Sequence, residues 1–371
     1  MTDWRPTYAE VDLAAIRNNV RSLCERLPAS VAKLAVVKAN AYGHGDVEVA
    51  RACLDAGADR FGVALVEEAV RLRDAGIDAP ILVLVETTPE AAKEIVARDI
   101  TPSVFTRAGA AALSDAAVAA GRSVDVHVCV DTGMHREGAP LIGAAEFVAD
   151  VAVMPGLVIE GLWSHFAVAD EDGNAFTDRQ LDRFSELCDA VARRGIEVPV
   201  RHIGNSVAAI SGEGHFDLVR LGIAMYGLYP AAWLRPLIDL EPAMRVVSAV
   251  GSVRRIPPGE GVSYGLEFTS ASETTIASVL IGYADGYPRR LGGKADVLIG
   301  GRRHRLAGRV TMDQIMVDCG DAEVGVGDEV VCLGSQGTSA IGADELAEIV
   351  GTINYEIVCG ISARVPRVHT G

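Results

Sequence analysis

Short β-branched runs alternate with longer amphipathic segments along roughly the first 240 residues, and this alternation limits the possible folds more than any other feature. The eight runs begin near residues 34, 61, 81, 101, 124, 158, 200 and 218. Helical patterns separate them, as at 46–57, 106–121 and 176–195, each ending near a glycine that suits a helix C-cap. A strand followed by a helix, eight times over, predicts a (β/α)8 barrel of the TIM type, an α/β fold, over residues 8–240.

The pattern changes near residue 245. The runs AVGSVRRI, TTIASVLIGYA, ADVLIGG, RHRLAGRVTMD, IMVDCG and DEVVCLG follow at hairpin-like spacing, separated by Gly, Pro and Asp turns. Spacing of this kind is typical of short antiparallel strands. We therefore expect a second, mostly β domain over residues 241–371.

Composition narrows the function classes. The 371 residues carry 34 Lys and Arg against 50 Asp and Glu, a net charge of −16, which disfavours nonspecific binding to nucleic acid or anionic membranes. Seven cysteines without CxxC spacing argue against a disulfide framework and a structural zinc site. The N-terminus lacks a basic head before an apolar stretch, and no segment approaches 18 apolar residues. We expect a cytoplasmic protein.

Polar residues follow most of the predicted barrel strands, at the C-terminal ends where the loops of such barrels carry their chemistry. They are Lys38, Asn40 and Tyr42 after the first strand, Asp131, Thr132 and Arg136 after the fifth, His165 after the sixth, Asn205 and Ser206 after the seventh, and Arg220 and Gly222 at the eighth. Each also has a structural interpretation: Lys38 could extend into water, His165 could be a satisfied core histidine, Ser206 a helix N-cap and Arg220 half of an ion pair. Their convergence on one rim favours a site.

The ligand of this rim can be inferred from its groups. The stretches GNS (204–206) and RLGIAMYG (220–227) offer accessible backbone amides and the Ser206 hydroxyl, where barrels of this kind often hold phosphate. Lys38, on another strand end, offers an amine. Pyridoxal 5'-phosphate (PLP) has both a phosphate and an aldehyde that condenses with a lysine. A metal is disfavoured, because no histidine pair has ligand spacing and no carboxylate cluster accompanies His165.

The sequence resembles the alanine racemase family over nearly its whole length. The motifs that carry the resemblance fall in the family's order: RPTYAEVDLAAIRNN, VVKANAYGHG, DTGMHREG, WSHFAVADE, HIGNSVA, DLVRLGIAMYG, VSYGLEF, GYADGYPRRL, GRVTMDQIMVD and INYEIVCGISARVPRVH. The resemblance implies a PLP-binding barrel and a C-terminal β domain joined by residues 1–7. It also implies a head-to-tail homodimer with shared active sites, and a role in supplying D-alanine for peptidoglycan.

Carried onto this sequence, the resemblance implies that Lys38 forms the Schiff base with PLP and is one catalytic base, while Tyr264 of the partner subunit is the other. Arg220 corresponds to the partner of the pyridine nitrogen, and His165 links Arg220 to Tyr264. The implied cofactor-binding residues are Lys38, Tyr42, His165, Asn205, Ser206, Arg220, Gly222, Ile223 and Tyr355. The implied substrate-binding residues are Arg136, Met312, Asp313 and Tyr283, with Arg136 and the Met312 backbone amide holding the substrate carboxylate.

Three positions depart from the family pattern. Where the family often has a lysine that becomes carbamylated and steers the substrate-binding arginine, this chain has Cys129. A thiol cannot form that carbamate, so something else must orient Arg136. His135 stands where a small or amide residue is common, and Thr311 where cysteine is frequent.

Other functions remain open at this point. The altered surroundings of Arg136 are compatible with a racemase for serine or a larger amino acid. A PLP carrier or regulator without turnover is a second possibility, although the complete β domain with VSYGLEF and TMDQ argues against it. A decarboxylase of the related barrel group is disfavoured, because its cysteine-bearing substrate motif is not visible.

Overall fold

The structure, a computed structural model, describes residues 4–371 and divides them into two compact units. We call residues 15–41 and 46–241 the barrel unit, and residues 4–14, 42–45 and 242–371 the β unit. No helix within residues 4–371 is both long and apolar enough to span a membrane.

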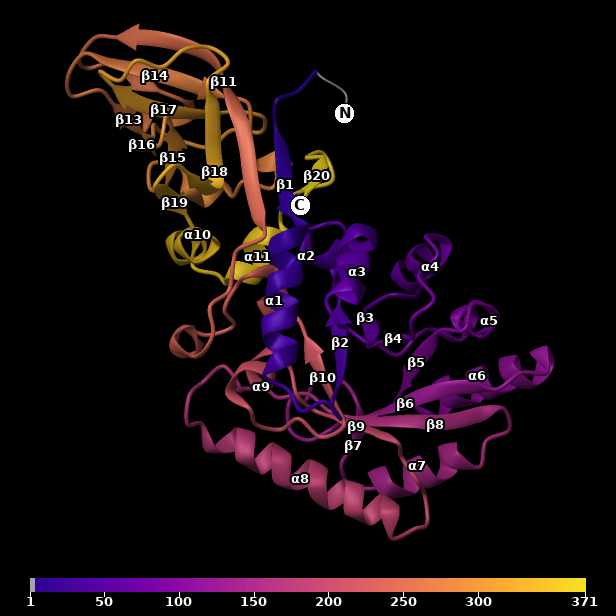
Figure 1. The fold of residues 1–371 in the computed structure, drawn as a ribbon. Helices are drawn as coiled ribbons and strands as arrows, with labels where there is room; N and C mark the ends of the chain where they lie inside the picture. Colours follow the sequence, from indigo (N-terminus) through magenta and orange to yellow (C-terminus); the bar gives the residue numbers. More distant parts are fainter. Residues whose placement is uncertain (1–3) are drawn as a thin grey trace. The chain divides into compact units, whose positions relative to one another are not determined.

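The barrel unit is built on a path of eight parallel strands in the order β10-β2-β3-β4-β5-β6-β8-β9 (Figure 1). Between β9 and β10, backbone bonds join Asp217 N to the Arg201 carbonyl at 3.0 Å and Arg220 N to the Gly204 carbonyl at 3.1 Å. The predicted barrel is therefore confirmed. Its strands are β2 (Ala32–Val36), β3 (Arg60–Val63), β4 (Ile81–Val83), β5 (Thr101–Val104), β6 (Val124–Asp131), β8 (Leu157–Trp163), β9 (Val200–His202) and β10 (Leu218–Leu221).

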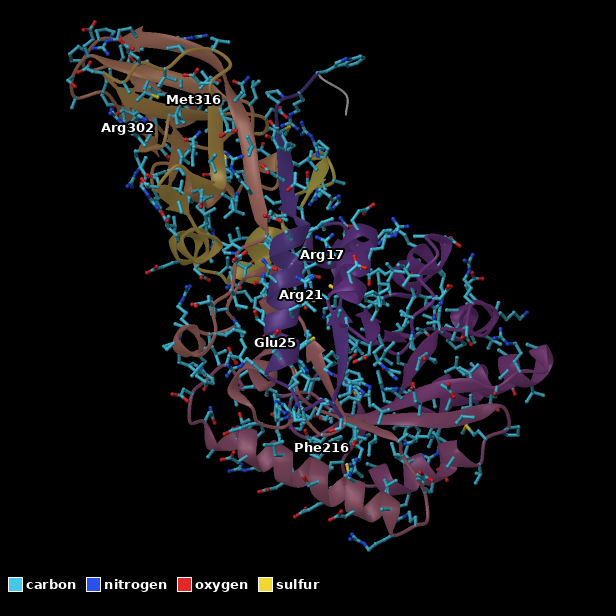
Figure 2. All side chains as sticks on the ribbon, in the orientation of Figure 1. Arg17, Arg21, Glu25, Phe216, Arg302 and Met316 are labelled. Carbon is cyan, nitrogen blue, oxygen red and sulfur yellow. The ribbon has the colours of Figure 1, made fainter. Side chains whose placement is uncertain are left out.

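Amphipathic helices connect these strands. Helix α1 buries Ile16 and Leu23, while Arg17, Arg21 and Glu25 lie one turn apart along its more polar side (Figure 2). An apolar stripe on one side of a helix, repeating every 3.6 residues, packs against the sheet while the polar side faces water. The helices are α1 (Leu13–Glu25), α3 (Asp46–Asp55), α4 (Val66–Asp74), α5 (Ala92–Ala97), α6 (Arg107–Ala120), α7 (Ala144–Ala152), α8 (Ala175–Ala192) and α9 (Ser206–Ser211).

The β unit is mostly antiparallel, as predicted, and its strand order is β19-β18-β15-β16-β17-β14-β11-β1-β20. Strand β11 pairs with β18 as well as β14, so the sheet curls back on itself around a core that includes Val262, Ile276 and Ala307. Met316, labelled in Figure 2, packs against this core. The elements are β1 (Tyr8–Asp12), β11 (Met244–Ile256), β12 (Gly261–Val262), β13 (Phe268–Thr269), β14 (Thr274–Val279), β15 (Asp296–Ile299), β16 (Arg302–Leu306), β17 (Ile315–Gly320), β18 (Glu329–Gln336), β19 (Ser339–Ile341), α10 (Ala343–Val350), α11 (Asn354–Cys359) and β20 (Arg367–Thr370).

The N-terminal segment belongs to the β unit. Strand β1 pairs with β11 and β20, the Thr7 hydroxyl bonds Ser248 at 2.9 Å, and Arg5 bonds Asp285 at 2.8 Å. We expected residues 1–7 to join the β domain, and Arg5 and Thr7 do contact the β unit. Residues 1–3 lie outside the described residues.

Candidate active site

The carboxyl ends of the barrel strands bring together polar side chains that are far apart in the sequence. Lys38 follows β2, Arg136 lies between β6 and β7 (Ala139–Pro140), His165 follows β8, Ser206 opens α9 and Arg220 lies on β10. Since all eight strands run parallel, these positions share one mouth of the barrel.

Lys38 is held in a setting that favours its neutral amine. Burial lowers the pKa of Lys38, and the nearby positive charge of Arg136 lowers it further. Glu68 and Glu137 act in the opposite direction with their negative charges. A less basic amine is a better nucleophile at neutral pH, so this lysine has the property that a reactive amine requires.

The backbone after Lys38 has an uncommon conformation that the sequence did not reveal. Ala39, Asn40, Ala41 and Tyr42 all have φ between 52° and 54°, so α2 (Lys38–Tyr42) contains a left-handed turn. Left-handed residues other than glycine cost roughly 1–2 kcal/mol each. The Glu68 carboxylate offsets part of this cost by accepting bonds from the amides of Ala39 (2.6 Å), Ala64 (2.8 Å) and Leu65 (3.1 Å).

Arg220 is almost fully buried, and its guanidinium group is fixed by neutral acceptors. It donates to His202 Nδ1 and His165 Nδ1, both at 2.8 Å, and to the carbonyls of Ser164 (3.0 Å) and Ile203 (2.9 Å). Among the described residues no carboxylate bonds it, so the ion-pair interpretation of Arg220 is wrong. Burial lowers the pKa of Arg220 to about 10, which still leaves a cation at neutral pH.

A chain of hydrogen bonds extends from Arg220 through the barrel interior. Because arginine can only donate, His202 Nδ1 accepts, and its Nε2–H donates to His127 Nδ1 at 2.8 Å. His127 Nε2–H then donates to Glu160 at 2.9 Å, and Arg60 bonds the same carboxylate at 2.9 Å. We call His202, His127 and Glu160 the interior relay. The donor or acceptor beside each ring nitrogen determines which nitrogen of His202 and of His127 carries the proton.

The pKa values within the relay follow from burial and charge. Burial lowers the pKa of His202 and His127, and the cation Arg220 adds to the effect at His202. Burial alone would raise the pKa of Glu160, but its bonds to His127 and Arg60 outweigh it and lower the pKa to about 2. The relay therefore holds neutral imidazoles between a guanidinium and a carboxylate.

His165 is the second histidine that accepts a hydrogen bond from Arg220. Its pKa is well below the usual range because of burial and then the charges of Arg220, Arg136 and Lys38. Since Nδ1 accepts from Arg220, neutral His165 carries its proton on Nε2. Trp163, stacked on His202 with centroids 5.7 Å apart, lies 5.0 Å from the Arg220 guanidinium and packs this cluster from within the barrel.

The loops after β9 and β10 are joined through Ser206. Asn205, rather than Ser206, is the N-cap of α9, with its side-chain oxygen accepting from Val207 N at 2.9 Å. Ser206 Oγ instead accepts from Gly222 N at 2.8 Å, and Ile223 follows at once in a 3-10 turn (Ile223–Tyr226). The N-cap interpretation of Ser206 is therefore wrong, and its hydroxyl is oriented toward the glycine amide.

Arg136 lies on a loop that closes on its own strand. Strand β7 pairs with Val130 and Asp131 of β6, so the intervening residues turn back over the strand end. Asp131 holds the turn through the amides of Gly133 (2.8 Å) and His135 (3.0 Å) and the His135 ring (2.8 Å). Arg136 contacts Glu137 at 3.3 Å.

The remaining expected site residues lie in the β unit and are more exposed. Tyr264, in a 3-10 turn (Tyr264–Leu266), is 73% exposed, and Met312 is 53% exposed. Tyr283 N bonds the Thr311 carbonyl at 2.9 Å, which places Tyr283 beside the segment that carries Met312. Arg364 bonds Asp313 at 2.8 Å. Within the same unit, the rings of Tyr42 and Tyr355 lie 6.0 Å apart.

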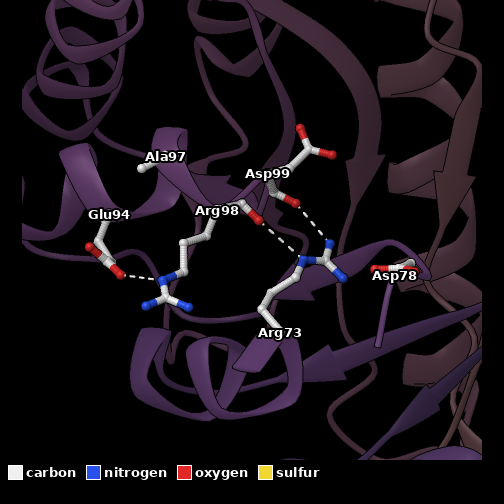
Figure 3. A pocket seen from close by; sticks show the side chains of 6 residues that line it. All are labelled: Arg73, Asp78, Glu94, Ala97, Arg98 and Asp99. Atoms are coloured by element: carbon white, nitrogen blue, oxygen red, sulfur yellow. Dashed lines mark hydrogen bonds and ion pairs between the residues drawn. The ribbon is translucent and has the colours of Figure 1, made fainter. Parts of the chain in front are cut away.

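A hollow of about 730 Å³ lies at the end of the barrel opposite the mouth (Figure 3). Arg73, in the last turn of α4, donates to the carbonyls of Arg98 (3.1 Å) and Asp99 (2.8 Å), just before β5. This clamp lies at the amino ends of the strands, where such barrels usually carry stability rather than chemistry. Within residues 4–371, no group of three or more His, Cys, Asp and Glu side chains is placed to hold a metal ion.

Comparison with known proteins shows the family of the chain. The model of the alanine racemase N-terminal domain matches residues 11–230, and that of the C-terminal domain matches residues 243–369. The chain belongs to the alanine racemase family. A curated alanine racemase from Symbiobacterium thermophilum is 45% identical, and the alignment covers 99% of this chain and 98% of the relative.

Solved structures related to this alanine racemase family member agree in fold. Alanine racemase from D-cycloserine-producing Streptomyces lavendulae aligns with a TM-score of 0.95 and 41% identity, covering 100% of this chain and 98% of that one. Histidine racemase from Leuconostoc mesenteroides subsp. sake has a TM-score of 0.91 and 28% identity, covering 100% and 99%. The same fold thus carries racemases named for different side chains.

Sequence reasoning missed Glu68 and Glu137 at the mouth and the interior relay within the barrel. The relay left a signal, because His127 and His202 are polar residues in runs that otherwise read as buried strands. Glu68 left none, since it resembles any first-turn glutamate of a helix.

Proposed function

We propose that the protein is a PLP-dependent racemase that interconverts L-alanine and D-alanine. The observation that carries the proposal is the pairing, at one barrel mouth, of a lysine with a lowered pKa and an arginine held by two neutral histidines. Lys38 and Arg220 stand where the alanine racemase family has its Schiff-base lysine and the arginine that contacts the pyridine nitrogen. A cytoplasmic location and a role in supplying D-alanine for peptidoglycan are part of the same proposal.

The donors at the mouth fit PLP. Among the described contacts, the Nε–H of Arg220 has no protein acceptor, and the pyridine nitrogen is an acceptor. The Ser206 hydroxyl, which accepts from the Gly222 amide, can donate its own proton to a phosphate, the following Ile223 amide suits the same group, and Asn205 shapes their loop. We assign Gly222, Tyr42 and Tyr355 to the phosphate on the family pattern. PLP would supply an aldehyde for the Lys38 amine and an electron sink beside the substrate α-carbon.

Racemisation requires proton removal on one face of the α-carbon and proton return on the other. Two acid/base groups on opposite faces serve this better than one, and we propose Lys38 and Tyr264 of the partner subunit. The Nε2–H of His165 can donate to a phenolate, which would favour the ionised form of that tyrosine. Arg220, whose pKa stays near 10 even when buried, remains a donor at neutral pH and would leave a pyridine nitrogen beside it unprotonated.

Substrate binding would use Arg136 and the Met312 amide for the carboxylate, with Asp313 and Tyr283 nearby in the β unit. The exposure of Tyr264, Leu266 and Met312 supports the homodimer, because exposed apolar side chains on neighbouring segments are typical of interfaces. Each active site would then combine two chains.

A racemase for serine or a larger amino acid remains the second candidate. The similarity to a histidine racemase favours keeping it, because it shows that the fold does not fix the side chain. A carrier without turnover has no such support.

The test is to incubate the purified protein with PLP and each of L-alanine, L-serine and L-histidine, and to measure the D-enantiomer formed. We expect fastest turnover with alanine, and a visible cofactor band that borohydride bleaches together with the activity. Faster turnover of another amino acid would replace alanine as substrate, and cofactor binding without any enantiomer exchange would support the carrier.

A further inference from the structure

We propose that Glu137 positions the substrate-binding Arg136, in the role that the carbamylated lysine has where the family carries one. The inference rests on the proposed function, because it concerns the group that would hold the substrate carboxylate. Its evidence is the geometry of the loop that follows β6.

The position of the family's carbamylated lysine carries no charge in this chain, and the Asp131 carboxylate at the end of β6 is bonded to Gly133 and His135. Cys129 is 3% exposed and lies two residues after His127, on the inward side of β6 that also faces the relay. Burial raises the pKa of the Cys129 thiol, and the neighbouring Glu137 carboxylate raises it further. The thiol therefore stays protonated and cannot act as a counterion for Arg136.

Glu137, the residue directly after Arg136, supplies an anion in place of that lysine. The loop returns to pair with β6 at Val130, which brings residue 137 back over the strand end that carries Cys129. The Glu137 side chain is 18% exposed, and its Oε1 lies 3.3 Å from Arg136 Nη2. A cavity of about 10 Å³, with room for roughly one water, is lined by Cys129, Arg136, Glu137 and His165 among others.

The charges of the mouth require such a partner. Lys38, Arg136 and Arg220 all act on His165 as positive neighbours. Without Glu137, Arg136 would face the buried cation Arg220 and a neutral thiol, and repulsion would favour its rotation toward solvent, where half of its side chain already lies. A carboxylate fixed by the loop holds the guanidinium in place while leaving its other donors for a ligand.

The experiment compares holoenzymes of the natural chain, Glu137→Gln and Glu137→Asp. Glu137→Gln keeps the shape and removes the charge, so we expect KM for alanine to rise about tenfold, equivalent to about 1.4 kcal/mol, with kcat changed much less. Glu137→Asp keeps the charge on a shorter side chain, so its KM for alanine should lie between those of the natural chain and Glu137→Gln. The matched control is Glu146→Gln, which removes a carboxylate paired with Arg194 elsewhere in the barrel unit.

A second measurement separates carboxylate binding from turnover. Calorimetry with propionate, a carboxylate without an amine, should show weaker binding to Glu137→Gln, while the cofactor band and the melting temperature stay unchanged. A rescue variant, Glu137→Leu with Cys129→Lys, should recover a low KM only when bicarbonate is present to form the carbamate.

The inference fails if the natural chain racemises alanine but Glu137→Gln and Glu137→Asp both keep its KM and propionate affinity. If the natural chain does not racemise any amino acid, the proposed function fails instead, and propionate binding still tests the pairing of Glu137 with Arg136.

Discussion

The interior of the barrel and the exposed turns of the β unit hold their functional side chains in opposite ways. Arg220 is 4% exposed and makes bonds to two histidines and two carbonyls, whereas Tyr264 is 73% exposed on a short turn. The first arrangement is complete within one chain, because a buried cation requires fixed partners. The surroundings of the exposed Tyr264 side chain depend on what packs against its turn. In the proposed enzyme, the barrel side of the site would therefore be preorganised, while the proposed second base would gain its surroundings by association.

The largest expected effect comes from Lys38→Ala. Removing the reactive amine should reduce racemisation by at least about 10³-fold and abolish the borohydride-trapped adduct. The barrel should still fold, because Lys38 lies beyond the end of β2 and outside the packed interior. Turnover and trapping of the adduct are the measurements, with circular dichroism as the control. Full turnover with a trappable adduct in this variant would exclude Lys38 as the attachment site.

Tyr264→Phe tests the β unit side of the comparison. Loss of one positioned acid/base group typically costs about 10²- to 10⁴-fold, and cofactor binding should survive because only the phenol oxygen is removed. Proton transfer in one direction should suffer most, which isotope exchange at the α-carbon of each enantiomer measures. An equal loss in both directions, with exchange from both enantiomers intact, would count against Tyr264 as the second base.

Mixing the two variants tests whether the sites are shared. A heterodimer of Lys38→Ala and Tyr264→Phe chains has one site with both defects and one with neither, so activity should recover toward half of the natural value per active dimer. The measurement is activity after subunit exchange, with heterodimer formation verified by mass. Heterodimers that remain inactive would show that each site is contained in one chain.

Glu160→Gln tests the barrel side. The variant keeps the shape but leaves His127 and Arg60 without their carboxylate, and we expect it to lower the free energy of unfolding by about 1–3 kcal/mol. Urea unfolding measures this change, and Glu186→Gln on the exposed side of α8 is the control. Unfolding that matches the natural chain would mean that the relay adds nothing to stability.

The pH dependence of stability tests whether the relay histidines are neutral in the folded chain. His127 and His202 have lowered pKa values in the folded chain, so below pH 6.5 the unfolded chain takes up protons that the folded chain does not. Stability should therefore fall as the pH drops below 6.5, by up to about 1.4 kcal/mol per pH unit for each histidine. Glu160 adds a further loss between its unperturbed 4.5 and about 2. Stability that stays level between pH 7 and 5 would contradict neutral histidines in the relay.

The convergence of several candidate residues could be predicted from their positions along the chain. Lys38, Arg136, His165, Ser206 and Arg220 were found because parallel strands must end on one face, so a polar residue after each strand points to the same mouth. The sequence could not predict that Ser206 bonds Gly222 rather than capping α9, because a cap and a cross-loop bond use the same hydroxyl.

Short windows of sequence specify the barrel, the β domain and the lysine at the first strand end, since periodicity and local turn residues encode them. The remaining features depend on contacts that form only in the folded chain. The left-handed turn after Lys38 depends on Glu68 from another helix, and the tautomers of His127 and His202 depend on Glu160 and Arg220 from other strands. Such features arise from contacts between distant segments, and no local pattern specifies a partner that the fold alone brings near.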